Sequence, residues 1–198
     1  MLIYNWIENY PFKSGIGWDP YPTSLRIVNW IKWVLVRSIK DRRIDQSILC
    51  QSRWLSKNIE YHIDANHLLA NIKALIFSSF YFEGVKSNNL LKKYEKLLLK
   101  VLSVQINEDG GHFERSPMYH RIILVDLLEI ISVYKLYGRE IPSQIMVCAE
   151  KMLAFMINFN HIDNDVSFFN DSTFGISTDY NQIIEYAKMH DIYHKFNP

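Results

Sequence analysis

Residues 107–138 of the chain read NEDGGHFERSPMYHRIILVDLLEIISVYKLYG, and they combine a turn, a helix start and a long helix. The residues Asn-Glu-Asp-Gly-Gly at 107–111 are typical of a turn, because they tolerate the backbone angles that a turn requires. Ser116 followed by Pro117 indicates a helix start, with serine as the N-cap and proline at the first helical position. We therefore expect an α-helix from Pro117 to Gly138, where glycine ends it.

Helical periodicity continues on both sides of this stretch. The first 22 residues are rich in proline and glycine, which predicts an irregular segment, and residues 166–169 read as an extended or loop segment. Six further helices are expected in these places: Thr23 or Ser24 to Lys40, Asp45 to Glu60, Asp64 to Gly84, Ser87 to Val104, after Pro142, and Asp179 to His190. The sequence therefore predicts an all-α protein, with about seven helices in one domain over residues 1–198. Helical hairpins in a bundle, in an α-solenoid or in part of an α/α toroid all fit the pattern.

The composition fits one folded globular domain. The chain has 198 residues, of which 48% are hydrophobic and 22% charged, and this is enough for one sizeable core. The net charge of +1 provides no overall field that would attract a nucleic acid or a membrane surface. No apolar run approaches the roughly 20 residues of a membrane-spanning helix. The N-terminus lacks the basic start of a signal peptide, and the compartment stays open, with a periplasmic or cell-envelope parent protein as one option.

Cysteines and aromatic residues give two weaker indications. Cys50 and Cys148 lie far apart in the sequence and in no metal-binding or redox spacing, so we expect buried free thiols and neither a metal nor another cofactor. Aromatic residues make up 14% of the chain. A bulky helical core explains this excess, and an aromatic-lined groove for sugar rings is the alternative.

A first candidate site lies at the start of the helix predicted from Asp64, its expected N-cap. On a helical wheel, His67 and Asn71 fall on one line of small and polar residues that continues to Ser78, and Asn66 flanks this line. Such a stripe beside an apolar face can line a cavity. The alternative, which the spacing favours, is a tight seam between helices in which Asn and His satisfy each other.

A second candidate site surrounds Tyr119, at the third position of the helix that begins at Pro117. Free N–H groups and the positive end of the helix dipole lie in this first turn and favour negative charge. Arg115 and Arg121 add positive charge nearby in the sequence. An ordinary phenol is almost fully protonated at neutral pH, and this environment favours the phenolate that a catalytic base would need. The alternative is a surface loop and helix cap in which Tyr119 only packs.

Together these segments resemble the heparinase II/III-like family of polysaccharide lyases, which includes related alginate lyases. The matching motifs occur in the family's order: Gly-Trp-Asp-Pro-Tyr-Pro-Thr-Ser-Leu-Arg at 17–26 with Asn29-Trp30, Asn-His-Leu-Leu-Ala-Asn at 66–71 with Ala74-Leu75, Phe-Glu-Gly at 82–84, Asp-Gly-Gly-His-Phe-Glu-Arg-Ser-Pro-Met-Tyr-His at 109–120 and, more weakly, Phe-Asn-Asp-Ser at 169–172 with Phe174-Gly175. The run at 109–120 is the most specific of them. The resemblance extends from about Trp6 to Gly175.

The resemblance implies an incomplete α/α toroid with a cleft for an acidic polysaccharide, which is cleaved by β-elimination at a uronic acid. In the family, an Asn and a neighbouring His neutralise the uronate carboxylate, and Asn66 and His67 match this pair. A tyrosine of the family serves as base, as acid or as both, and Tyr119 occupies its place. The chemistry requires that these side chains act on one sugar. Further residues are expected to contact the substrate: Trp18, Tyr21, Arg26, Trp30, Asn71, His112, Glu114, Arg115 and His120.

Simpler interpretations exist for several of these residues. Trp18 and Trp30 fit simple packing of the N-terminal segment at least as well. Glu114 and Arg115 also fit an ion pair with each other, and the two histidines fit loop or cap positions.

The sequence departs from the family on its C-terminal side. Members continue into a large β-sandwich that carries a further His of the site and, in some members, a metal site, and nothing like it follows here. We therefore expect a truncated domain: an excised piece, the product of a split gene, or a protein that works with a missing β-sandwich domain or a second chain. The activity of such a chain alone stays open, and the apolar helix faces that a cut toroid would expose predict self-association or poor solubility. A non-catalytic module that binds acidic glycans is the main alternative function, and a helical scaffold without a sugar ligand is the third.

Overall fold

The computed structural model describes residues 2–63 and 65–192. These residues form eight α-helices and one short 3-10 helix, and their only β-type pairing is an isolated bridge between Ile106 and His112. The prediction of an all-α protein is therefore confirmed. The chain divides into two compact units, Met1–Lys96 and Leu97–Pro198, and the boundary falls within α5 (Val85–Gln105). The prediction of a single domain stays a prediction.

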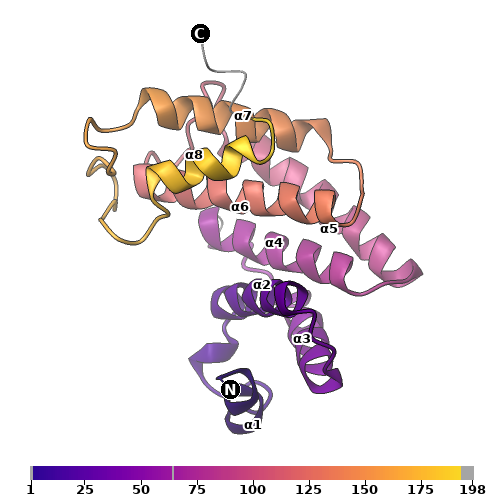
Figure 1. The fold of residues 1–198 in the computed structure, drawn as a ribbon. Coiled ribbons are helices and arrows are strands. Elements are labelled where there is room, and N and C mark those ends of the chain that lie inside the picture. Colours follow the sequence, from indigo (N-terminus) through magenta and orange to yellow (C-terminus); the bar gives the residue numbers. More distant parts are fainter. Residues whose placement is uncertain (1, 64, 193–198) are drawn as a thin grey trace. The chain divides into compact units, whose positions relative to one another are not determined.

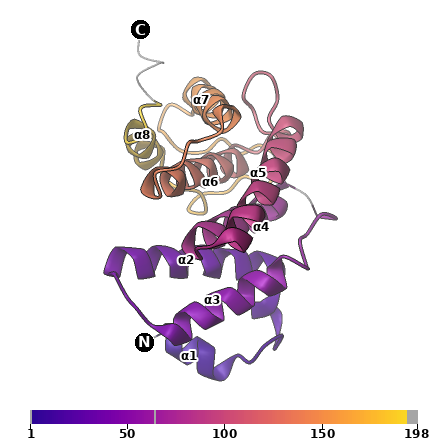
Figure 2. The same cartoon turned by 90° about the vertical axis from the view of Figure 1, so that its right-hand side faces the viewer.

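The first unit is built around α4 (Ala65–Tyr81), which is buried continuously from Leu68 to Phe80. α2 (Pro20–Arg37) makes its most extensive contact with α4 and also packs against α3 (Arg42–Leu55), as Figure 2 shows for α2 and α3. Apolar side chains at helical spacing form the buried face of α2: Ile27, Ile31 and Val34. This packing supplies most of the stability of such helices, and it fixes where the start of α4 lies relative to α2.

The N-terminal region corrects the prediction that residues 1–22 are irregular. It forms α1 (Leu2–Asn9) and the 3-10 helix η1 (Ile16–Trp18), and α2 begins at Pro20 rather than at Thr23. Prolines suggested a break, but in the first turn of a helix a missing N–H group costs no hydrogen bond, because these groups have no partner within the helix. Pro20 therefore marks a helix start rather than an irregular segment.

Tertiary contacts explain why so short a helix as α1 forms. The ring of Trp6 lies 5.3 Å from the ring of Trp18 and 5.4 Å from that of Trp30, and Ile3 is buried. Isolated helices of this length are marginal in water, so the aromatic contacts with residues far along the chain stabilise it.

The boundaries of α2 and α3 also differ from the prediction. α3 begins at Arg42 rather than Asp45, because the side chain of Asp41 caps it by accepting a hydrogen bond of 2.8 Å from the backbone N–H of Arg43. It ends at Leu55 rather than Glu60, and residues 56–63 form turns and irregular structure. α2 ends three residues early, at Arg37 rather than Lys40. Asp64, the predicted N-cap of α4, lies outside the described residues.

In the second unit, α7 (Ser143–Asn158) and α8 (Tyr180–Lys188) both pack against α6 (Pro117–Leu136) (Figure 1). A long loop, residues 159–179, connects α7 to α8, and it includes the predicted non-helical segment 166–169. The predicted helix starts of this unit are confirmed: Pro117, the residue after Pro142, and Asp179 as the N-cap of α8.

Both cysteines are free, and their surroundings correct the expectation of buried thiols. Cys50 is exposed and Cys148 is half-buried. Cys50 lies outside the buried face of α3, which consists of Ile44, Ile48, Gln51, Ser52 and Leu55. Free cysteines are usually buried in protein cores. Cys50 is exposed because it lies on the face of α3 that does not pack against the core.

Candidate functional site

Four residues of the first unit, Tyr21, Glu60, His67 and Asn71, form what we call the His67 cluster. The ring of Tyr21 stacks on the imidazole of His67, with ring centroids 4.3 Å apart and planes inclined by 21°. The Nδ1 atom of His67 lies 3.3 Å from Oε1 of Glu60. The structure thus brings together three predicted site residues, Tyr21, His67 and Asn71, and adds a carboxylate, that of Glu60, which the sequence analysis did not include.

The amide of Asn71 holds this cluster in place. Its Oδ1 atom accepts a hydrogen bond of 2.9 Å from the backbone N–H of Glu60, and its Nδ2 atom donates to Oε2 of Glu60 at 3.1 Å. Nδ2 also donates to Oγ of Ser24 in α2 at 3.0 Å. Asn71 therefore ties α4 to α2 and to the turn that carries Glu60. The residue is 0% exposed, and its predicted contact with a sugar stays a prediction.

Asn66 and His67 lie in the first turn of α4, and both are half-buried. The side chain of His67 is 33% exposed, whereas that of Glu60 is only 8% exposed. The first N–H groups of a helix have no partner within the helix and form its positive end. The two residues are thus accessible at a helix terminus that favours a negatively charged ligand.

Three predicted cleft residues, Trp18, Arg26 and Trp30, belong instead to the aromatic cluster around Trp6. The guanidinium carbon of Arg26 lies 3.9 Å from the centre of the Trp6 ring, and its Nε–H donates to Oε1 of Gln51 at 2.7 Å. Burial lowers the pKa of Arg26 to about 10, so the guanidinium keeps its charge at neutral pH. Both tryptophans are buried. Packing of the N-terminal segment accounts for these positions, and contact of these residues with a sugar stays a prediction.

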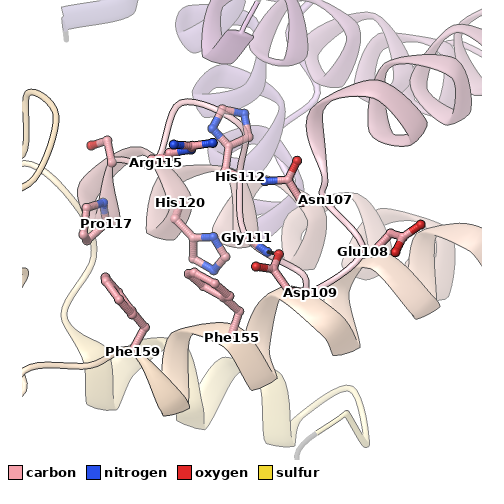
Figure 3. A pocket seen from close by; sticks show the side chains of 11 residues that line it. Asn107, Glu108, Asp109, Gly111, His112, Arg115, Pro117, His120, Phe155 and Phe159 are labelled. Carbon is pink, nitrogen blue, oxygen red and sulfur yellow. Dashed lines mark hydrogen bonds between the residues drawn. The ribbon is translucent and has the colours of Figure 1, made fainter.

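In the second unit, a pocket of about 670 Å³ opens beside the turn at 107–111 (Figure 3). It is lined by Asn107, Glu108, Asp109, Gly111, His112, Arg115, Ser116, Pro117, His120, Phe155 and Phe159. Two glycines allow the turn to lie directly on α7. A Cβ atom on Gly110 would lie 2.3 Å from the carbonyl oxygen of Lys151, and one on Gly111 would lie 3.0 Å from the Phe155 ring. A side chain at position 110 would therefore force the turn away from α7, whereas one at position 111 would require the ring of Phe155 to shift.

His120 is buried at the wall of this pocket. Its Nε2–H donates to the carbonyl oxygen of Met152 at 2.9 Å, and its ring lies 5.1 Å from the ring of Phe155. Figure 3 shows the side chains of His120 and Phe155 next to each other. Burial is the main reason that the pKa of His120 falls to about 4, so the imidazole is neutral at neutral pH. Its Nδ1 atom has no hydrogen-bond partner among the described residues. This nitrogen is itself buried, so the pocket does not expose it.

His112 and Glu114 lie together on the other side of the turn. Nδ1 of His112 is 3.6 Å from Oε2 of Glu114, and its Nε2 is 3.5 Å from Oε1 of Gln105. His112 is buried, whereas Arg115 is exposed and adopts a left-handed backbone conformation with φ of 54°. Glu114 thus faces His112. The left-handed backbone of Arg115 is strained, because this residue is not a glycine, and such strain often occurs at functional sites.

Tyr119 occupies the first turn of α6, as predicted, and is half-buried. Its backbone N–H donates to Oγ of Ser116, the N-cap, at 3.3 Å. Arg121 was expected to add positive charge near Tyr119. It is buried, and its Nη2 donates a hydrogen bond of 2.7 Å to Oδ1 of Asn160 in the loop 159–179. Tyr119 belongs to the second unit, and Asn66 and His67 belong to the first.

The weakly matching segment 169–172 closes over the start of α6. The hydroxyl of Ser172 lies 3.0 Å from that of Ser116 and accepts a hydrogen bond of 3.2 Å from the backbone N–H of Met118. Nδ2 of Asn170 donates to the carbonyl oxygen of Arg115 at 3.3 Å. Two serine hydroxyls therefore satisfy N–H groups at the helix start beside Tyr119.

Sequence reasoning missed Glu60 and Phe155. Glu60 lies in an irregular segment without a motif, and only its contact with Asn71, eleven positions away, shows its role. Phe155 lies in α7, outside the motifs that indicated the site, and the sequence carried no signal for it. The Asn-Asp-Ser segment did carry a signal, because it matched the family motif.

The described residues contain no group of three or more His, Cys, Asp or Glu side chains arranged to hold a metal ion. In the same part of the chain, no helix has the length and apolar character needed to cross a membrane.

Comparison with known proteins was made at the level of sequence and of fold. The model of the family described as "Heparinase II/III N-terminus" matches residues 5–196. A heparin-sulfate lyase from Bacteroides stercoris is 28% identical over 115 residues, which make up 57% of this chain and 17% of that protein.

Solved structures show the same fold. A crystal structure of heparinase III superposes with a TM-score of 0.77 at 21% identity over 96% of this chain and 32% of that chain. A heparan sulfate lyase from Pedobacter heparinus superposes with a TM-score of 0.67 at 19% identity over 98% of this chain and 34% of that chain. The chain thus spans about a third of these solved chains and resembles their helical part. Because the family model covers nearly its whole length, the chain belongs to the heparinase II/III N-terminus family.

Proposed function

We propose that the chain is the helical, substrate-binding and catalytic part of a lyase that cleaves a heparan sulfate-type polysaccharide by β-elimination at a uronic acid. The family match over residues 5–196 carries this proposal. The names of the relatives, a heparin-sulfate lyase and a heparan sulfate lyase, support this class of substrate. The places of Asn66, His67 and Tyr119 at two helix starts add chemical support.

The first demand of the reaction is neutralisation of the uronate carboxylate. The proton at C5 lies next to this carboxylate and is barely acidic while the carboxylate keeps its charge. Asn66 and His67 are half-buried in the first turn of α4, and the positive end of the helix dipole there favours an anion. We assign these two side chains to the carboxylate, where their hydrogen bonds strengthen as charge develops in the transition state.

The second demand is a base for the C5 proton and an acid for the departing oxygen at C4. We assign both to Tyr119, whose phenolate would take the C5 proton as the C4=C5 double bond forms and the C4–O4 bond breaks. The resulting phenol would then give its proton to O4. This assignment rests on the position of Tyr119 in the motif at 109–120, which resembles that of the family.

The pocket beside Gly111 offers a place for neighbouring sugar units. Phe155 and Phe159 supply apolar surface, and the exposed Arg115 supplies a cation. A sulfated or carboxylated sugar presents matching groups: C–H faces for the rings and an anion for the guanidinium.

The test is incubation of the purified chain with heparan sulfate, heparin and alginate, with the ultraviolet absorbance of the unsaturated uronate product as the signal. We expect product from heparan sulfate. A chain that is folded by circular dichroism and gives no product from any of the three would contradict the proposal. Binding of heparan sulfate without product would instead support a non-catalytic glycan-binding module.

A further inference from the structure

Glu60 is a buried carboxylate with no role in the reaction as described so far. Its side chain is only 8% exposed, yet it faces an imidazole that is 33% exposed. A buried carboxylate is costly unless hydrogen bonds or charges compensate it. Each of its two oxygens has such a partner, and the two partners are different residues.

The orientation of this carboxylate is fixed from one side. Oε2 of Glu60 accepts from Nδ2 of Asn71 at 3.1 Å, and the backbone N–H of Glu60 donates to Oδ1 of the same amide at 2.9 Å. The amide is itself fixed, because Nδ2 also donates to Oγ of Ser24 at 3.0 Å. With Oε2 held by Asn71, Oε1 is the oxygen that points to His67, 3.3 Å from Nδ1.

We propose that Glu60 is a positioning residue that holds the His67 imidazole in the Nδ1–H tautomer, so that Nε2 is the nitrogen offered to a ligand. An ionised carboxylate only accepts hydrogen bonds, so the nitrogen that faces it carries the proton. The stacked ring of Tyr21, 4.3 Å away, fixes the plane of the imidazole. Such partners of a functional histidine set which nitrogen is available.

The tautomer itself does not depend on the proposed function, but its role toward a uronate does. When Nδ1–H is bonded to Glu60, Nε2 faces the uronate carboxylate. A proton that enters from solvent as the ligand binds can then lie between Nε2 and this carboxylate. That proton neutralises the carboxylate, as elimination requires. Glu60 would then act through His67 and never touch the sugar.

The test is nuclear magnetic resonance of the chain with ¹⁵N-labelled histidine, because long-range proton–nitrogen correlations distinguish the two neutral tautomers. The chain contains 7 histidines, and the signals that disappear in His67→Gln identify those of this residue. In the wild-type chain above the pH of imidazole protonation, we expect the Nδ1–H pattern. A wild-type Nε2–H pattern would overturn the inference without any further variant.

Glu60→Gln provides the sharper comparison. In this variant, Nδ2 of Asn71 still donates a hydrogen bond, so the amide oxygen of the glutamine should take the position of Oε2. The NH₂ group of the glutamine then faces Nδ1 of His67. Because Nδ1 must then accept, we expect the tautomer to switch to Nε2–H. The matched control is Glu83→Gln, which changes an exposed carboxylate of the same unit and is expected to leave the His67 signals unchanged. A folded Glu60→Gln chain that keeps the Nδ1–H pattern would overturn the inference.

The outcomes for the inference and for the proposed function can be told apart, because the tautomer is measured without substrate. An Nδ1–H imidazole in a chain that forms no product supports the positioning role and contradicts only the lyase function. Product from a chain whose His67 is the Nε2–H tautomer supports the lyase function and contradicts only the role of Glu60.

Discussion

Asn66 and His67 are neighbours in sequence, but they meet different demands in the first turn of α4. His67 is oriented by Tyr21 and Glu60, whereas Asn66 is half-buried beside it at the helix start. The proposed reaction uses both on one carboxylate, and the charge that they stabilise is largest in the transition state.

Replacement of either side chain should therefore slow the reaction more than it weakens binding. For Asn66→Ala and for His67→Ala, we expect kcat to fall by roughly 10²- to 10³-fold, the usual cost of removing one such donor, with a much smaller change in Kd for heparan sulfate. The matched controls are Asn89→Ala and His62→Ala, which change exposed residues of the same unit. Equal losses in kcat and in binding affinity would contradict the assigned role and indicate a binding role alone.

His120 should make the stability of the chain depend on pH. Burial lowers its pKa from 6.5 to about 4 in the folded state, so the unfolded chain binds more protons between these values and stability falls as the pH falls from 6.5 to 4. The full loss corresponds to about 3 kcal/mol. Urea unfolding at a series of pH values measures it.

The effect of His120 is isolated by comparing variants. His120→Gln should flatten the decline between pH 6.5 and 4, while His161→Gln, which changes an exposed histidine, should leave it as in the wild type. An unchanged decline in His120→Gln would show that other groups cause it.

At the residue scale, local signals could be predicted and distant contacts could not. Ser116, Pro117 and Tyr119 lie within four consecutive positions, and their order alone placed Tyr119 in the first turn of a helix. Glu60 is eleven positions from Asn71, and no periodicity links an irregular segment to a helix. For Trp18 and Trp30, residue type alone left two interpretations open, because aromatic rings suit both sugar stacking and core packing.

At the scale of elements, the turn at 107–111 depends on its close contact with α7. Gly110 has φ of +90°, and a Cβ atom there would lie 2.3 Å from the carbonyl oxygen of Lys151. Gly138 also has positive φ, +60°, but a Cβ atom there would meet nothing within 4 Å. Alanine substitutions at these two positions therefore distinguish the cost of backbone strain, which both share, from the cost of the clash with α7, which only position 110 has.

Gly110→Ala should destabilise the chain more than Gly138→Ala. We expect Gly138→Ala to lose about 1 to 2 kcal/mol from the left-handed backbone alone. Gly110→Ala should lose roughly 1 to 3 kcal/mol more, because the turn must move away from α7. Urea unfolding at neutral pH measures both, and equal losses would contradict the close approach of the turn to α7.

Helix existence could be predicted for most elements, but some boundaries could not. α5, α6 and α7 follow apolar spacing and start close to the predicted residues. α1 was missed because it is short and is stabilised by Trp6 against distant rings. The end of α3 was placed too late, because sequence periodicity runs on into the segment that Asn71 holds in a turn.

At the scale of the whole molecule, the family could be predicted because its motifs are spread over both compact units. The matches at 17–30 and 66–84 belong to the first unit, and those at 109–120 and 169–175 belong to the second. The division into units was not visible in the sequence, because the boundary lies inside α5, where helical periodicity is unbroken.

The central claim is that Tyr119 performs the proton transfers of β-elimination, and comparison of the wild-type chain with Tyr119→Phe tests it most directly. The measurement is the rate of unsaturated uronate formation from heparan sulfate, together with Kd for the same polysaccharide and with Tyr10→Phe, an exposed tyrosine of the other unit, as control. We predict that Tyr119→Phe loses roughly 10²- to 10⁴-fold in rate, as expected for removal of a general acid–base group, with Kd nearly unchanged. Turnover by Tyr119→Phe at the wild-type rate would contradict the account.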